Sequence, residues 1–259
     1  MITLTSDFGL KDPYVAEMKG VILAINPKAT LVDVTHEVEK FNVRMAAFML
    51  ASAAPYFPQG AIHLAVVDPG VGTQRRAILI QTKKSIFVGP DNGILILAAQ
   101  NQGVEHVYQF TNRMFMLAKI SSTFHGRDIF APAAAYLDKG IEPREFGPEI
   151  KDPAKPEFVS VKRANRSLIG EVMLIDGFGN IITNINETDI VQNNAEKVDV
   201  DLPVISLKLT LGKTYAETKP KEPIALIGSH GFVEIALNQG NAAEKFHAKA
   251  GDKIVVTAA

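Results

Sequence analysis

The clearest chemical pattern in this sequence is an apolar strand that leads into a carboxylate, a glycine-rich turn and two arginines. It occupies residues 63–76 and reads HLAVVDPGVGTQRR. Ligands of α/β sheets bind at the carboxyl ends of the strands, and Gly70 and Gly72 allow the backbone to turn sharply and approach a ligand closely. We therefore expect Asp68 and Arg75 to meet, either as a functional pair or as an ordinary ion pair that closes the loop.

A second polar segment, TSDFGLKD at residues 5–12, follows the first predicted strand. A carboxylate such as Asp7 at a strand end commonly accepts hydrogen bonds from a ribose diol. Asp12 is either part of the same site or a plain helix N-cap. Phosphatases of the haloacid dehalogenase type also begin with such an aspartate, but they carry a second one two residues later, where this chain has Gly9. That function is therefore disfavoured.

Two further segments contain residues that could carry chemistry. His125 lies in SSTFHGRD at a predicted helix start, where the positive helix end favours a neutral imidazole that can exchange protons near pH 7. A lone histidine can equally be structural. The segment DGFGN at residues 176–180 has the composition of a hairpin turn with two glycines.

Composition limits the classes of function. The 259 residues are 47% hydrophobic and 21% charged, which indicates a globular chain with one large domain or two unequal ones. The formal net charge of −1 gives no electrostatic basis for binding nucleic acid or anionic lipid, so we expect a small-molecule substrate. Cysteine is absent, which suits a reducing compartment. We find no secretory leader and no apolar run of about 18 residues, and we therefore expect a cytoplasmic protein without a membrane span.

Strand-like and helix-like segments alternate up to about residue 150, which predicts a layered α/β domain with a central, mostly parallel sheet. A polar, proline-bearing stretch at 151–156 then suggests a boundary, and we predict domains 1–152 and 153–259. The second half contains closely spaced short strands, typical of a small antiparallel β-barrel or sandwich, and we expect the barrel. The predicted strands are 1–5, 31–34, 61–67, 77–81, 85–88, 168–175, 181–185, 197–200, 205–211, 224–227, 232–237 and 253–257. Helices are predicted after Asp12, after Asn42 and over 126–137.

Taken together, the polar segments resemble one family along nearly the whole chain. The motifs are, in order, TSDFG, VVDPGVG-x-x-RR, PDNG, TFHGRD, IDGFGN and SHG-x-x-E-I. Their order and distribution over both domains resemble the S-adenosylmethionine hydroxide adenosyltransferases, which share a fold with bacterial fluorinases and chlorinases.

The resemblance implies attack of water or hydroxide on C5′ of S-adenosyl-L-methionine (SAM), which releases adenosine and L-methionine without a cofactor or a metal. Asp68, Arg75 and His125 match the catalytic set of the family. The sulfonium is its own leaving group, so the protein must position and activate water. Attack by the Asp68 carboxylate itself, through an ester, remains open. The resemblance also implies a preference for the R epimer at sulfur.

Binding roles carry over by matching position. Asp7 matches the residue that accepts the ribose hydroxyls, and Asp12 lies near the amino-acid end of the substrate. The remaining matches lie in the second domain: Asp176 at the methionine moiety, Phe178 in the same loop, Asn180 at the adenine edge, Ser229 with His230 at the methionine carboxylate, Glu234 at the ammonium, and Ala242 in a stretch whose backbone meets adenine. In relatives the site lies between subunits of a homotrimer, and we expect the same assembly here.

Three alternatives remain. A SAM-dependent halogenase is disfavoured because fluorinases carry tyrosine at the position of Asp68 and serine at that of Gly126, and a carboxylate repels halide. A non-catalytic SAM or adenosine sensor would not need three titratable or cationic groups at one place. A metal-dependent phosphoesterase would have to recruit residues that lack a compact ligand spacing, namely Asp7, Asp33, His36, His63 and Asp91.

Overall fold

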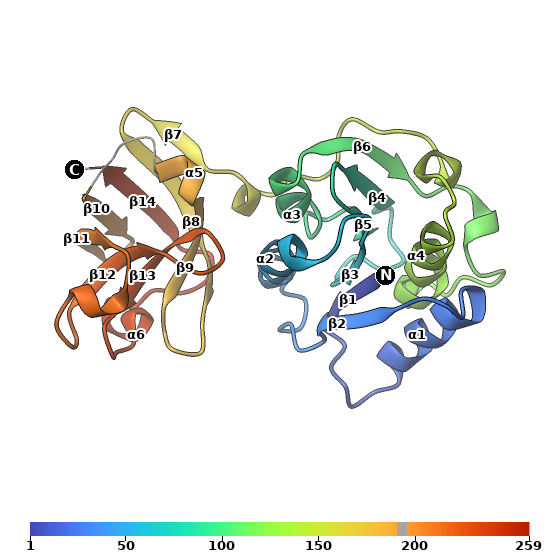
Figure 1. Cartoon of the computed structure of the whole chain (residues 1–259), viewed down its shortest axis with the longest axis horizontal. Coiled ribbons are helices and arrows are strands. Elements are labelled where there is room, and N and C mark those ends of the chain that lie inside the picture. The colour runs from blue at the N-terminus through green and yellow to red at the C-terminus, as the bar shows by residue number, and fades with distance from the viewer. Residues whose placement is uncertain (191–195, 259) are drawn as a thin grey trace. The chain divides into compact units, whose positions relative to one another are not determined.

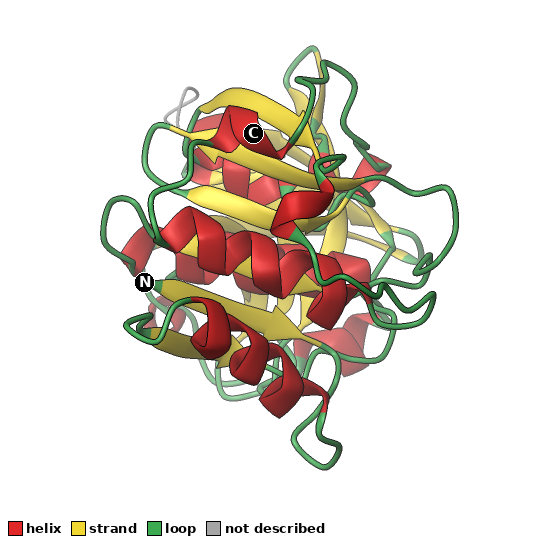
Figure 2. Ribbon diagram, turned by 90° about the vertical axis from the view of Figure 1, so that its right-hand side faces the viewer, coloured by secondary structure: helices red, strands yellow, loops and turns green. Residues whose placement is uncertain are grey.

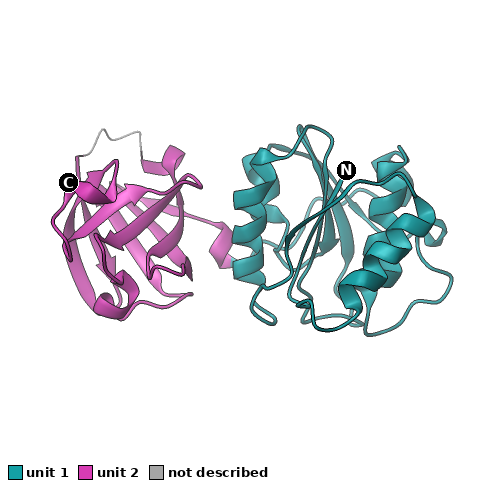
Figure 3. Ribbon diagram, turned by 60° about the horizontal axis from the view of Figure 1, so that its bottom comes forward, with its two compact units in different colours: residues 1–156 teal, residues 157–259 magenta. Residues whose placement is uncertain are grey.

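A computed structural model describes residues 1–190 and 196–258 of the chain (Figure 1). The chain divides into two compact units, residues 1–156 and residues 157–259 (Figure 3). The polar stretch 151–156 thus forms the end of the first unit. In the described ranges no helix combines the length and the apolar character that crossing a membrane requires.

The first unit is built on a six-stranded sheet with the order β2-β1-β3-β5-β4-β6. Strands β2, β1, β3 and β5 are parallel, whereas β4 runs antiparallel to both β5 and β6. The predicted layered domain with a mostly parallel sheet is confirmed, although β6 was not predicted. The strands are β1 (Ile2–Ser6), β2 (Leu31–Thr35), β3 (Ile62–Val66), β4 (Ala77–Thr82), β5 (Ile86–Pro90) and β6 (Val104–Gln109).

Helices cover both faces of this sheet (Figure 3). One pair consists of α1 (Tyr14–Ile25) and α4 (Ala131–Asp138), which lie in front of the strands in Figure 2. The other pair consists of α2 (Val43–Ala53) and the unpredicted α3 (Ile96–Asn101). Asn42 caps α2 as predicted, because its side chain accepts a hydrogen bond from the N–H of Met45 at 2.9 Å.

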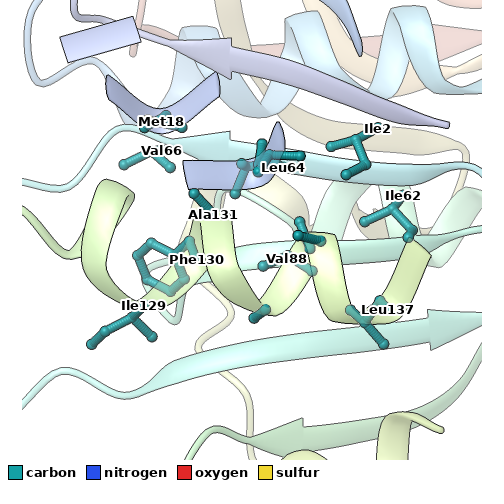
Figure 4. Close-up of a cluster of buried hydrophobic side chains, with 14 of the residues drawn as sticks. Ile2, Met18, Ile62, Leu64, Val66, Val88, Ile129, Phe130, Ala131 and Leu137 are labelled. Atoms are coloured by element: carbon teal, nitrogen blue, oxygen red, sulfur yellow. The ribbon is translucent and has the colours of Figure 1, made fainter. Parts of the chain in front are cut away.

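The central strands are buried along their whole length, as expected for parallel strands covered on two faces. Their apolar side chains pack against α1, α4 and the turn before α4, where Phe130 is fully buried (Figure 4). This core holds the carboxyl ends of β1 and β3 in fixed positions.

A π-helical turn at Gly126–Phe130 precedes α4. Its cause is Pro132, which has no N–H to donate to the carbonyl of Asp128 four residues earlier. The Asp128 carbonyl instead accepts the N–H of Leu117 at 2.9 Å. The predicted helix 126–137 is therefore present, but its first turn is widened directly after His125.

The second unit contains a closed seven-stranded barrel in the order β14-β10-β11-β12-β13-β9-β8, which β14 and β8 close by pairing. The expected barrel is confirmed, with one difference: β11 and β12 pair in parallel over two residue pairs, because residues 213–222 cross over instead of forming a hairpin. The short β7 (Lys162–Ala164) adds to β8. The barrel strands are β8 (Ser167–Ile175), β9 (Ile181–Asn186), β10 (Lys197–Leu202), β11 (Ile205–Gly212), β12 (Pro223–Ile227), β13 (Phe232–Leu237) and β14 (Lys253–Ala258); the helices are α5 (Glu187–Ile190) and α6 (Ala242–Phe246).

Candidate active site

The parallel pairing of β1 and β3 brings the two aspartates to one edge of the sheet. Ser6 and Val66, the last residues of these strands, are paired in register. Asp7 follows β1 directly and Asp68 follows β3 after one more residue. Both side chains line the same cavity.

Asp68 and Arg75 meet, as their positions on the strand and the turn predicted. The Nε of Arg75 donates to Oδ1 and Oδ2 of Asp68 at 2.9 and 3.0 Å, and its Nη2 also bonds to Oδ2. The side chain of Arg75 is only 11% exposed and that of Asp68 only 6%, so this pair is not a weak ion pair on the surface. The guanidinium also lies over the Phe130 ring, with its Cζ 5.2 Å from the ring centroid. The guanidinium is thus held by both the carboxylate and the ring.

His125 joins this pair through the same guanidinium. Nη2 of Arg75 lies 2.9 Å from Nδ1 of His125, and it also bonds to Asp68. Burial lowers the pKa of His125 and the charge of Arg75 lowers it further, while Asp68 and Asp128 oppose the shift. We expected the helix end to favour a neutral imidazole; in the structure burial and Arg75 act in that direction.

The cavity beside these residues has a volume of about 330 Å³. Its walls carry three carboxylates, those of Asp7, Asp12 and Asp68, together with aromatic side chains. Three of the rings contact one another: the centroids of Phe8, Tyr14 and Phe124 are separated by 5.2–5.7 Å. Carboxylates and aromatic rings together suit a ligand with a positive charge and an apolar body. The lining residues are Asp7, Phe8, Asp12, Tyr14, Lys40, Phe41, Val66, Asp68, Val71, Thr123, Phe124, His125 and Gly126.

Asp7 is nearly buried and is fixed by the loop that precedes α2. Its Oδ2 accepts the N–H of Phe41 at 2.9 Å, and its carbonyl accepts a hydrogen bond from Lys40. Within the described part of the chain, Oδ1 of Asp7 has no partner, so it is available to a ligand. Phe41 adopts a left-handed backbone with φ of 64°, lines the cavity and is 69% exposed. The sequence analysis missed both Lys40 and Phe41, whose only signal was their position before the Asn42 cap.

Asp12 is not a helix cap, which corrects one of the two interpretations. Helix α1 begins at Tyr14, its N-cap position is Pro13, and no side chain caps it. Pro13 was expected in the first turn of the helix, after an Asp12 cap, but it occupies the N-cap position itself. Asp12 is exposed at the cavity and has no hydrogen-bond partner among the described residues. Its carboxylate therefore remains available to a ligand.

In the second unit, Asp176 organises the loop between β8 and β9. Its Oδ1 accepts the N–H groups of Phe178 and Asn180, each at 2.9 Å, and its Oδ2 accepts the Asn180 side-chain amide at 2.9 Å. Phe178 is 82% exposed. Gly179 is required here, because its φ is 84° and a Cβ would lie 2.2 Å from the Asn241 side chain. The loop is a hairpin turn that exposes Phe178, whereas Asn180 is buried and its amide is bonded to Asp176.

The barrel also holds Glu234, which is 5% exposed. Tyr215 donates its hydroxyl hydrogen to Glu234 at 2.7 Å, and the sequence analysis missed this tyrosine. Burial raises the pKa of Glu234 and nearby Asp176 raises it further, although the Tyr215 hydrogen bond opposes the shift. Ser229 lies exposed in the turn between β12 and β13, and buried Ala242 is the first residue of α6.

The residues that a metal-dependent phosphoesterase would recruit have other partners. His63 is fully buried, with its Nδ1 2.8 Å from the Thr3 hydroxyl. Asp91 bonds to Arg76, whereas His36 contacts Asp33 at 3.0 Å. In the ranges that the structure describes, no three His, Asp or Glu side chains are grouped as metal ligands.

Comparison with known proteins agrees with this arrangement. The SAM hydroxide adenosyltransferase N-terminal domain matches residues 2–147, and the C-terminal domain of the same family matches residues 170–255. The chain belongs to the SAM hydroxide adenosyltransferase family. The chain is 38% identical over 260 residues to the (R)-S-adenosyl-L-methionine hydrolase of Salinispora tropica, and the match covers 99% of this chain and 97% of that one.

Two further comparisons concern a more distant relative in sequence and a similar solved structure. A fluorinase of Actinoplanes sp. is 27% identical and covers 100% of this chain and 98% of its own. The crystal structure of an uncharacterized conserved protein from Thermotoga maritima superimposes with a TM-score of 0.87 at 39% identity, covering 99% of this chain and 100% of that one.

Proposed function

We propose that this protein hydrolyses SAM to adenosine and L-methionine. The observation that carries the proposal is the Asp68–Arg75 pair, which is bonded to His125 and lies at a cavity that Asp7 also lines. The 38% identity to an (R)-S-adenosyl-L-methionine hydrolase supports the same activity.

In the proposed reaction, the oxygen of water forms a bond to C5′ while the C5′–S bond breaks. The electron pair of that bond passes to sulfur, so methionine leaves as a neutral thioether and needs no general acid. One proton of the water is released. Catalysis therefore depends on holding water in line behind C5′ and on accepting its proton.

The contact with Arg75 determines which ring nitrogen of neutral His125 carries the proton. A guanidinium has only N–H donors, so Nδ1 of His125 must be the acceptor of the 2.9 Å hydrogen bond. The proton of the neutral ring is then on Nε2. His125 donates this N–H to the oxygen of the nucleophilic water and orients it.

Asp68 then accepts the proton of the water. Arg75 engages both carboxylate oxygens, yet Oδ1 accepts only the Nε bond and so retains acceptor capacity, and Asp68 lines the cavity. The positive charge of Arg75 also favours a hydroxide-like nucleophile.

The remaining candidate residues bind the substrate in this proposal. Asp7 accepts the ribose hydroxyls through its unpartnered oxygen, and Asp12 lies at the amino-acid end. The second-unit residues hold the methionine and adenine ends: Asp176, Phe178, Asn180, Ser229, Glu234 and Ala242. Glu234 is suited to an ammonium group, because a cation would offset the cost of burying its charge beside Asp176.

The finer features of the proposal are the R sulfonium epimer, the absence of a cofactor or metal, and a cytoplasmic location. The name of the Salinispora relative supports the R epimer, and the cysteine-free composition supports a reducing compartment. We also propose a homotrimer in which two copies complete each site, since the candidate residues are divided between two units. Light scattering tests this assembly, and a fully active monomer would contradict it.

Water, not halide, is the nucleophile in this proposal. A carboxylate at position 68 repels a halide that must shed its own water. A serine at position 126, which fluorinases carry, has little space here: a Cβ on Gly126 would lie 3.1 Å from the Phe124 ring and 3.2 Å from the Met18 sulfur.

Chromatography of the products tests the function. The purified protein is incubated with epimerically defined R and S SAM, with and without chloride, beside Asp68→Ala. We expect adenosine and methionine from the R epimer, and neither from the variant. Formation of 5′-chloroadenosine would establish a halogenase, and binding without turnover would establish a sensor.

A further inference from the structure

The PDNG segment at residues 90–93, which ends β5, contributes no side chain to the cavity. Its two polar side chains nevertheless bond to both ends of the loop that carries Asp68 and Arg75. Strand β5 pairs directly with β3, so its carboxyl end lies beside the start of this loop. The strands approach so closely that a Cβ on Gly89 would lie 2.3 Å from the Ala65 carbonyl oxygen.

Asn92 holds the start of the loop. Its Nδ2 donates to the carbonyl of Val67 at 2.8 Å, and Val67 immediately precedes Asp68. Its Oδ1 accepts the N–H of Ile94 at 3.2 Å, which fixes the orientation of the amide. The backbone that carries Asp68 is therefore bonded to a neighbouring strand end.

Asp91 holds the other end of the loop. Its Oδ2 accepts a hydrogen bond from Arg76 Nε at 2.7 Å, and its N–H donates to the Arg76 carbonyl at 2.9 Å. That carbonyl also accepts Nη1 of Arg75 at 3.2 Å. The Asp91 side chain is 4% exposed, and its Oδ1 accepts the N–H of Ala154 at 2.7 Å. The bonds of Asp91 thus reach the guanidinium of Arg75 through a single shared carbonyl.

We propose that Asp91 and Asn92 are positioning residues, which set the distance and angle between Asp68 and Arg75 by holding residues 67 and 76. The inference rests on the proposed hydrolysis of SAM, because alignment of the pair matters most when water must lie in line with C5′. A displacement of about 1 Å at such a site can lower the rate about 100-fold without weakening substrate binding.

The chain offers a matched control for Asn92. Asn112 in the same unit also donates Nδ2 to a distant carbonyl, that of Glu145 at 2.8 Å, and accepts the N–H of Met114, two residues later, at 3.1 Å. It lies outside the cavity lining. Asn92→Ala and Asn112→Ala therefore each remove one side-chain bond to a distant carbonyl and one bond from the N–H two residues later. Only Asn92→Ala releases the loop that carries Asp68.

The test compares kcat, KM and melting temperature of these two variants with those of the wild type. We expect Asn92→Ala to lower kcat about 10- to 100-fold with KM within about threefold, and Asn112→Ala to leave kcat unchanged at a similar loss of melting temperature. Equal kcat values for the two variants would overturn the proposal. If Asn92→Ala does not fold, Asn92→Asp, which keeps an acceptor for the Ile94 N–H but has no N–H to donate to the Val67 carbonyl, must show the same selective loss of kcat.

A spectroscopic readout separates this inference from the proposed function. Solvent exchange of the Arg75 Nε–H, assigned in ¹H–¹⁵N spectra by its loss in Arg75→Lys, reports on the bond to Asp68 without any turnover. We expect faster exchange in Asn92→Ala than in Asn112→Ala. If the wild type fails to hydrolyse SAM, the proposed function fails, while this comparison still decides whether Asn92 holds the pair; identical exchange in the two variants would refute it.

Discussion

Replacing Arg75 by lysine should disable the proposed site while leaving the positive charge in place. Arg75 bonds to both Asp68 oxygens through Nε, and through Nη2 to Asp68 and to Nδ1 of His125. A lysine ammonium is a point charge and cannot reproduce this fork. Loss of two hydrogen bonds to charged groups, at about 1.5 kcal/mol each, predicts a loss of about 3 kcal/mol, or about 100-fold in kcat/KM.

Arg127→Lys is the matched control. Arg127 also forms a two-atom contact with a buried carboxylate, Asp128, at 2.6 and 3.2 Å, but it does not line the cavity. Steady-state kinetics with R-SAM and thermal melting of both variants give the comparison. A kcat/KM of Arg75→Lys within threefold of the wild type, or an equal loss in Arg127→Lys, would refute the reasoning.

The same variant should change the pH dependence in a defined direction. Protonation of His125 at Nδ1 would oppose the Arg75 N–H, so activity is lost as the pH falls through the pKa of His125. Burial and the Arg75 charge lower that pKa, and the wild type therefore keeps its activity to a lower pH. In Arg75→Lys the hydrogen bond to Nδ1 is lost, and the acid limb of kcat should move to higher pH. A shift to lower pH would contradict the assigned tautomer.

Four further predictions follow from the structure. In a single turnover in H₂¹⁸O, adenosine should carry ¹⁸O at the 5′ position, whereas attack by Asp68 through an ester would leave ¹⁶O there. Gly126→Ser should lower kcat about tenfold, because its Cβ meets Phe124 and Met18, and should produce no 5′-chloroadenosine in chloride. Burial lowers the pKa of His63 to about 4, so on acidification the unfolded chain takes up a proton at His63 before the folded chain does. The free energy of unfolding should therefore fall by about 3 kcal/mol between about pH 6.5 and pH 4. Urea unfolding at the two pH values measures this fall, and His63→Leu should abolish the part that is due to His63. Activity should survive excess EDTA; loss of activity that Mg²⁺ or Zn²⁺ restores would establish a metal site.

The parts of the molecule that were predictable from the sequence depend on local patterns. The apolar runs of β1 and β3, the Asn42 cap and the glycine turn after Asp68 each follow from residues close together in the chain. Asp68 and Arg75 are seven residues apart in the sequence, and their contact was also predictable.

Interactions over longer separations had no such signal. The interpretation of Asp12 as the N-cap was wrong because α1 begins one residue later than the position of Pro13 suggested. Lys40 and Phe41 bond to Asp7 across 33 and 34 residues, and Asn92 bonds to Val67 across 25. The pairing of strands, not the local sequence, brings these groups together. Tyr215 meets Glu234 across 19 residues, because it lies in the crossover between β11 and β12, and β12 pairs with β13, which carries Glu234.

Phe130 belongs to the buried apolar core (Figure 4), and the Arg75 guanidinium lies over its ring. Protein engineers usually treat interior repacking for heat resistance and tuning of turnover as separate tasks. At this position they are one task, because any change in the volume or tilt of the ring alters the support of the cation beside Asp68. A library that varies the interior of this protein should therefore keep position 130 constant, or be screened for turnover as well as for melting temperature.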